Sequence, residues 1–289
     1  MPVSFVRPSD KEATLHCEPT SVGVVSWNSR AAEGSLSLRV RFADAYRSAW
    51  LPYVKWSPHN RQSLSPRDEE VTIETDVVAA TKPFAAIDVR SSERMDALAL
   101  ATPAGLPARP AAAVAPFELD VPQCSQFMNG DRGWCSPASL AMLLQFHGYR
   151  VDVQSVAGAV HDDAYDGTGN WTFNVAYASS FGLRTFVAYL RDLEHAHAFV
   201  SRGLPLALSY AWKPGELDGA PLEHSDGHLA VLRGFDALGD PVVNDPAQPD
   251  VRVTYRRAQL ECAWLAHGGI AYVVAPLQGP DPVALVNDP

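Results

Sequence analysis

The stretch from Trp134 to Gly148 is the most restrictive pattern in the chain, and it reads Trp-Cys-Ser-Pro-Ala-Ser-Leu-Ala-Met-Leu-Leu-Gln-Phe-His-Gly. Ser136 suits a helix N-cap, Pro137 the first helical position and Gly148 the residue just after a helix. Few residues between those ends are polar, so the predicted helix is apolar on nearly every face and belongs inside a domain. The partial positive charge at its N-terminus would stabilise a thiolate at Cys135.

The composition is that of a folded protein with one large or two medium domains. The chain has 289 residues, of which 47% are hydrophobic and 19% charged. Its formal net charge is -10 and no basic run occurs, which argues against a nucleic-acid partner. No apolar stretch approaches the roughly 20 residues that span a bilayer, and the N-terminus lacks a signal pattern. We therefore expect no membrane partner and a cytoplasmic location, unless a leader was removed. The sequence leaves the oligomeric state open.

The cysteines do not form a framework. Cys17, Cys124, Cys135 and Cys262 are too few and too scattered for a set of disulfides, and no Cys-x-x-Cys pair indicates zinc or a redox dithiol. No cofactor is predicted. We expect Cys135 to be special and the other three to be small buried apolar groups.

The order of predicted elements gives an α+β chain in two domains. Residues 1–100 contain short segments with period-two alternation, such as Val22–Trp27 and Leu36–Phe42, which predict an all-β sandwich. Residues 101–116 are rich in Ala and Pro and are predicted to be a linker. Residues 117–276 carry helices first and antiparallel strands after, and residues 277–289 are predicted to be an irregular tail.

Three tryptophans in the first domain allow two interpretations. Trp27, Trp50 and Trp56 could form a carbohydrate-binding face. Because aromatic residues dominate cores generally, the favoured prediction is that they fill the interior of the sandwich.

A cysteine nucleophile needs a base, an orienting group for that base and a donor for the oxyanion. His228 begins one predicted strand and Asp245 ends the next, so a hairpin between them would bring the two side chains together. Gln126 precedes Cys135 and could supply its side-chain amide to the oxyanion, with the Cys135 backbone N–H as the second donor. Cys135, His228, Asp245 and Gln126 are therefore the predicted catalytic residues.

These residues carry a resemblance to a known family. Gln126, the run from Trp134 to Met142, Gly227-His228-Leu229-Ala230-Val231 and Asn244-Asp245-Pro246 together resemble the bacteriocin-leader-processing peptidase-like family, a bacterial group within the papain-like superfamily. The resemblance covers about residues 117 to 276. It implies a papain-like fold, with Cys135 as nucleophile, His228 as general base, Asp245 as its orienter and Gln126 in the oxyanion hole.

The chain departs from the family pattern at two points. Ser136 stands where the transporter-linked leader peptidases usually have Gly, which weakens the case for a double-glycine leader as substrate. Nine residues separate Gln126 from Cys135, so the segment between them must form a loop that returns Gln126 to the site.

Metal binding is the alternative interpretation of two polar clusters. His224, Asp226 and His228 occupy alternate positions of a predicted strand, so their side chains would share one face, as metal ligands do. No fourth ligand is evident. His161, Asp162, Asp163 and Asp166 only loosely resemble a calcium loop, since the 12-residue spacing is absent.

The leading functional prediction is a thiol hydrolase that cleaves a peptide or related amide through an acyl-enzyme on Cys135. Its partner would be a peptide or protein substrate, and transfer of the acyl group to an amine stays open. The alternative is a catalytically inactive binding module on a papain-like scaffold, in which the N-terminal sandwich recognises a protein or a glycan.

Overall fold

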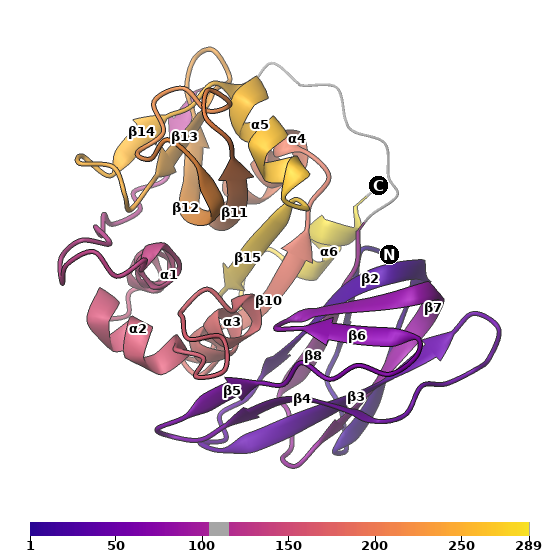
Figure 1. Ribbon diagram of the computed structural model, residues 1–289. Coiled ribbons are helices and arrows are strands. Elements are labelled where there is room, and N and C mark those ends of the chain that lie inside the picture. Colours follow the sequence, from indigo (N-terminus) through magenta and orange to yellow (C-terminus); the bar gives the residue numbers. More distant parts are fainter. Residues whose placement is uncertain (104–115, 289) are drawn as a thin grey trace. The chain divides into compact units, whose positions relative to one another are not determined.

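A computed structural model describes residues 1–103 and 116–288 of the chain (Figure 1). The chain divides into two compact units. The first comprises residues 1–104 and 160–187, and the second comprises residues 105–159 and 188–289. Most of the predicted linker, residues 104–115, lies outside the described residues.

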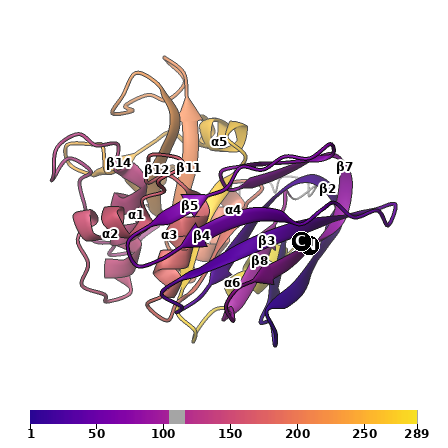
Figure 2. The same cartoon turned by 60° about the horizontal axis from the view of Figure 1, so that its bottom comes forward.

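The first unit is built on eight antiparallel strands joined by hydrogen bonds into one sheet. Their order is β1-β8-β2-β7-β3-β4-β5, with β6 paired to β7. In Figure 2, β3, β4 and β5 lie side by side as this order requires. The strands are β1 (Val3–Val6), β2 (Glu12–Asn28), β3 (Gly34–Phe42), β4 (Leu51–Trp56), β5 (Arg61–Ser63), β6 (Val71–Glu74), β7 (Val77–Ser91) and β8 (Ala97–Ala101).

The two longest strands, β2 and β7, form the middle of this sheet. Their pairing shifts register between His16 and Thr20 and again between Thr20 and Val22, and such irregularities bend a strand. All eight strands belong to one hydrogen-bonded sheet. The two-layer sandwich stays a prediction.

Aromatic rings fill the interior of the first unit. Trp27 is 2% exposed and stacks on Trp56 with 5.4 Å between ring centroids. Phe173, from a helix far along the chain, meets the Trp27 ring edge-on at 5.8 Å. Trp27 and Trp56 are thus core residues, as the favoured interpretation predicted, whereas Trp50 is half-buried between the guanidinium groups of Arg39 and Arg90.

The chain enters the first unit a second time at residues 160–187, which the sequence assigned to the peptidase domain. This segment contains α3 (Trp171–Ser179) and the first part of β10 (Arg184–Tyr189). Two buried carboxylates attach it to the strands: Asp162 accepts the Ser63 N–H at 3.0 Å, and Asp76 accepts the Trp171 N–H at 2.7 Å. The limits of the two domains stay a prediction.

The second unit contains a sheet with strands in the order β15-β11-β12-β13-β14, in which β9 also pairs with β12. β10, at the β15 edge, completes seven strands. No helix in the described ranges has the length and apolarity that crossing a membrane requires. The elements are β9 (Phe117–Glu118), α1 (Cys135–Phe146), α2 (Val153–Val160), α4 (Leu193–Val200), β11 (Leu206–Trp212), β12 (Ser225–Phe235), β13 (Pro241–Asn244), β14 (Arg252–Thr254), α5 (Arg257–Ala266), β15 (Ile270–Ala275) and α6 (Pro282–Asn287).

Helix α1 confirms the predicted buried helix but not its predicted start. The helix begins at Cys135, so the assignment of Ser136 as N-cap is wrong. The Ser136 hydroxyl is instead hydrogen-bonded to the Tyr272 hydroxyl at 3.0 Å, a tertiary contact that a local pattern does not reveal. At the other end Gly148 adopts a φ of 86°, and the Gly148 and Tyr149 N–H groups close the last turn, as the Gly stop predicted.

The C-terminal residues correct the predicted irregular tail. They contain the short helix α6, which is capped when the Asp281 carboxylate accepts the Val283 N–H at 3.1 Å. The Leu285 carbonyl is hydrogen-bonded to His195 Nε2 at 3.0 Å, which attaches this helix to α4. The cap and the Pro at position 282 are ordinary helix-start signals that the sequence analysis missed.

Phe173→Ala should destabilise the first unit by about 3–5 kcal/mol, because it removes a buried aromatic side chain and leaves a cavity beside Trp27. Denaturant unfolding of the wild type and the variant measures the loss. Tyr46→Ala is the control, since Tyr46 is 53% exposed, and its effect should be much smaller. Equal losses in the two variants would contradict a core role for Phe173.

Candidate active site

Cys135 is the first residue of α1 and is half-buried. The N–H groups of a first helical turn have no acceptor within the helix, so the Cys135 N–H is free to bind a ligand. The helix dipole places partial positive charge at the thiol. In Figure 1, α1 lies beside the strands β11 and β12, which it contacts.

A buried hydroxyl aligns α1 with β12. Ser139 follows Cys135 by one helical turn, and its Oγ donates to the Leu229 carbonyl at 3.0 Å. Because Leu229 is next to His228, this bond fixes the position of the cysteine along the strand that carries the histidine. It also explains why a serine occupies a fully buried position in an otherwise apolar helix.

His228 and Asp245 meet inside the second unit. His228 lies on β12, and Asp245 directly follows β13, the strand paired with β12. His228 Nε2 is 2.7 Å from Asp245 Oδ1, and both residues are at most 2% exposed. The imidazole also interacts with the Cys135 thiol, and Nδ1 is the ring nitrogen that does not face Asp245. Three of the four predicted site residues therefore lie together.

The charges of these groups reinforce one another. Burial alone would lower the pKa of His228, but the Asp245 carboxylate and the Cys135 sulfur raise that pKa to about 10. Burial would raise the pKa of Cys135, yet the hydrogen bond and charge of His228 hold it below the usual thiol value. The pKa of Asp245 is likewise lowered, since His228 and other donors outweigh its burial. This combination favours a thiolate beside an imidazolium.

Two tyrosines complete the surroundings of Asp245, and the sequence analysis missed both. The Tyr210 hydroxyl donates to Asp245 Oδ2 at 3.0 Å and the Tyr255 hydroxyl donates to the same oxygen at 2.8 Å. Tyr210 lies on β11 directly opposite His228. This pairing register identifies Tyr210 as a residue of the site. The register is known only once β11 is known to pair with β12.

Gln126 lies beside the other end of the Asn244-Asp245-Pro246 run. Its backbone N–H donates to the Pro246 carbonyl at 2.9 Å. The Asn244 side chain holds the preceding residues by donating to the Val121 and Pro122 carbonyls, both at 3.1 Å. The Gln126 residue is 6% exposed, and its buried Oε1 has no hydrogen-bond partner in the described part of the chain. That oxygen is thus available to accept a hydrogen bond from a ligand.

Aromatic rings shield the histidine from water. The Trp212 ring meets the His228 ring edge-on at 5.6 Å, and the Tyr210 ring does so at 5.5 Å. Trp212 is 3% exposed and its Nε1 donates to the Leu222 carbonyl at 3.1 Å. Because these rings keep water away from the imidazole, its electrostatic interaction with the Asp245 carboxylate is stronger.

The remaining cysteines differ from the prediction that all three are buried. Cys124 is buried, but Cys17 is half-buried and Cys262 is exposed. Burial raises the pKa of Cys17 to about 11, which makes this thiol a poor nucleophile. Cys262 lies on α5. The spacing of the cysteines in the sequence did not show which face of this helix is exposed.

The two polar clusters that could be interpreted as metal sites are not arranged as metal sites in the described residues. Within residues 1–103 and 116–288, no group of three or more His, Cys, Asp and Glu side chains is arranged to hold a metal ion. His228 is engaged by Asp245, and Asp162 accepts the Asn170 side-chain amide at 2.8 Å.

Two solved structures and one family model are similar to the chain. One solved structure, described as a C39-like peptidase from Bacillus anthracis, is 20% identical with a TM-score of 0.46 and covers 58% of this chain and 100% of its own. Another, a double glycine motif protease of an AMS/PCAT transporter in complex with the leader peptide, is 19% identical with a TM-score of 0.39 and covers 56% and 99%. No curated protein matches the chain. A family model described as the Peptidase_C39 like family matches residues 118–272, which is more than half of the sequence. The chain belongs to this family of papain-like peptidases, as its resemblance predicted.

Proposed function

We propose that the protein is a cysteine peptidase that cleaves a peptide or related amide bond through an acyl-enzyme on Cys135. The observation that carries the proposal is the contact series in which Asp245 holds His228 at 2.7 Å and His228 holds the thiol at the start of a buried helix. Nucleophile, base and orienting group are the three parts that such chemistry requires.

Acylation follows from the ion pair. The Cys135 thiolate attacks the substrate carbonyl carbon and forms a carbon–sulfur bond. His228 carries the former thiol proton and donates it to the leaving nitrogen as the carbon–nitrogen bond breaks. Asp245 stabilises the imidazolium meanwhile and fixes which ring nitrogen faces the sulfur.

The oxyanion formed on attack needs donors, and we assign two. The Cys135 N–H lies in the first helical turn, and the Gln126 side chain, which is 6% exposed, would donate from its Nε2. Preorganised donors of this kind stabilise the transition state more than the substrate. Water activated by neutral His228 then hydrolyses the thioester, and an amine in the same position would instead accept the acyl group.

Cys135 should be alkylated faster than the exposed Cys262 at about pH 6 to 7, because its pKa lies below the usual thiol value of about 8.5. As pH falls through that lowered pKa the thiolate is protonated and the rate should fall. Peptide mass spectrometry after iodoacetamide treatment reports each site separately. His228→Ala should remove the advantage of Cys135. Equal rates at the two cysteines in the wild type would contradict an activated nucleophile.

Cys135→Ala should abolish cleavage of a peptide library, with products read by mass spectrometry. Gln126→Ala should reduce kcat about 10²- to 10³-fold, as the loss of one oxyanion donor does elsewhere. Gln154→Ala, at an exposed glutamine on α2 that the site does not use, controls for the loss of a glutamine side chain elsewhere. Cleavage that survives in Cys135→Ala would rule out the acyl-enzyme.

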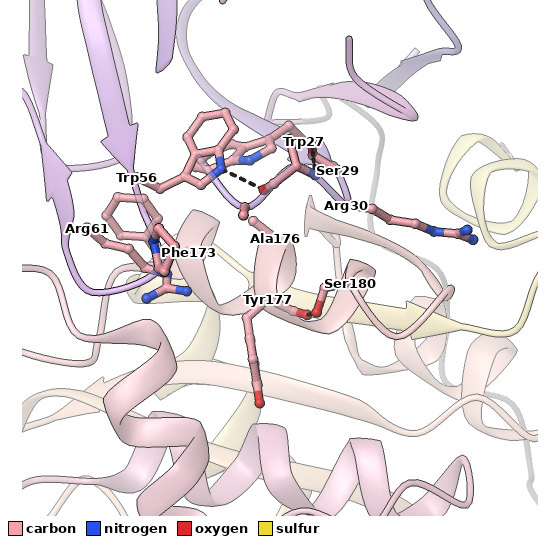
Figure 3. Close-up of a pocket in the computed structure, with 12 residues that line it drawn as sticks. Trp27, Ser29, Arg30, Trp56, Arg61, Phe173, Ala176, Tyr177 and Ser180 are labelled. Atoms are coloured by element: carbon pink, nitrogen blue, oxygen red, sulfur yellow. Dashed lines mark hydrogen bonds between the residues drawn. The ribbon is translucent and has the colours of Figure 1, made fainter. Parts of the chain in front are cut away.

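A second candidate function is recognition by the first unit, and a cavity favours it. The cavity has a volume of about 220 Å3 and is lined by Trp27, Trp56, Phe173 and Arg61 among others. Figure 3 shows that Arg30 and Tyr177, which also line it, extend away from the tryptophan rings. Arg61, whose charge Asp163 also attracts, lines the cavity and gives a ligand carboxylate a cation to bind. An apolar side chain next to a carboxylate fits these surroundings.

The cavity should bind N-acetyl-phenylalanine more tightly than its neutral amide, as measured by calorimetry. Arg61→Gln should weaken binding of the carboxylate about tenfold or more, whereas Arg30→Gln should have little effect. Cys135→Ala should leave this binding unchanged. Equal affinities for the acid and the amide would contradict a carboxylate site.

A further inference from the structure

Asp245 carries more hydrogen bonds than an orienting carboxylate needs. Oδ1 accepts His228 Nε2 at 2.7 Å and the Ala247 N–H at 3.0 Å. Oδ2 accepts the hydroxyls of Tyr210 at 3.0 Å and Tyr255 at 2.8 Å. Asp245 is 0% exposed, so these protein donors replace the water that would otherwise solvate the charge.

The tyrosine hydroxyls are held as donors. Gln248 Nε2 donates to the Tyr255 oxygen at 3.2 Å, which leaves the Tyr255 proton for Asp245. Tyr210 is fixed by its place opposite His228 in the β11–β12 pairing. Burial and the Asp245 charge raise the pKa of both hydroxyls, so they stay protonated wherever the protein is folded.

Two donors on Oδ2 weaken the field that Asp245 exerts on His228. A carboxylate whose charge is shared with hydroxyl protons attracts a nearby cation less than an unshared one does. His228 already binds its proton strongly, with a pKa of about 10. A peptidase histidine must release that proton to the leaving nitrogen, so a stronger carboxylate would hinder turnover.

We propose that Tyr210 and Tyr255 are positioning residues that limit the basicity of Asp245, so that protonated His228 can still deliver its proton. The proposal rests on the proposed function of Cys135 and His228. In the step concerned, the proton moves from His228 to the amide nitrogen while the carbon–nitrogen bond breaks, and neutral His228 remains beside the thioester.

Titratable groups face His228 from several elements. Cys135 faces it from α1, Tyr210 from β11, Asp245 from the end of β13 and Tyr255 from the segment after β14. His267, after α5, lies beside the neighbouring Gly227, and burial lowers its pKa. Asp245 is therefore the anion that the tyrosines share with His228 once Cys135 is removed.

The test is an NMR titration of His228 in the Cys135→Ala background, which removes the coupled thiolate. Tyr210→Phe and Tyr255→Phe should each raise the midpoint by about half a pH unit, because less charge on Asp245 is shared. Asp245→Asn should move the midpoint in the opposite direction. His228→Gln identifies the resonance among the nine histidines.

Tyr53→Phe is the matched control, since it also removes a buried hydroxyl, one that donates to the Val25 carbonyl in the first unit. Its midpoint should equal that of the parent. Midpoints that stay unchanged or fall in both site variants would overturn the proposal. If Tyr255→Phe fails to fold, Tyr210→Phe and Gln248→Ala decide the question.

Failure of the proposed function would be seen separately. In the chain that retains Cys135, it would show as alkylation of Cys135 no faster than that of Cys262. The titration instead reports only on how the tyrosines act through Asp245, so the two failures give different results.

Discussion

The negative charge of Asp245, buried in the second unit, is the constraint on which the site depends. A carboxylate without water needs donors, and it finds them in a histidine, a backbone N–H and two tyrosine hydroxyls. Those donors come from β11, from β12 and from the turns on both sides of β14, so the sheet must be correctly paired before the charge is tolerated. The same charge holds His228 as a cation and thereby lowers the pKa of Cys135.

The sheet also decides where the nucleophile lies. The Ser139 hydroxyl bound to the Leu229 carbonyl fixes α1 against β12, and the Asn244 side chain bound to Val121 and Pro122 fixes the segment that leads to Gln126. Both Ser139 and Asn244 are polar residues that are fully buried. Polar groups in a core are costly unless paired, so these contacts specify one arrangement of helix, strand and loop.

The features that local chemistry determines could be read from the sequence, and those that long-range pairing determines could not. The buried helix with its Gly148 stop and the hairpin of β12 and β13 follow from neighbouring residues. The contact of His228 with Asp245 followed from that hairpin. Tyr210 and Tyr255 did not, since their roles depend on β11 pairing with β12 and on the turn after β14. The return of residues 160–187 to the first unit was also hidden, because Phe173 in isolation is only another apolar helical residue.

The order of the site residues along the chain has a consequence for biosynthesis. The ribosome adds Cys135 first among the site residues of this unit's helix and strands, then residues 160–187 of the other unit, then His228, Asp245 and Tyr255 in turn. Until Tyr255 has left the ribosome, the Asp245 carboxylate lacks one of its hydrogen-bond donors. Its contact with His228 is therefore not yet fixed. The thiol therefore remains an ordinary cysteine from the synthesis of Cys135 until the second sheet closes, and the nascent chain is protected from its own reactivity over that interval.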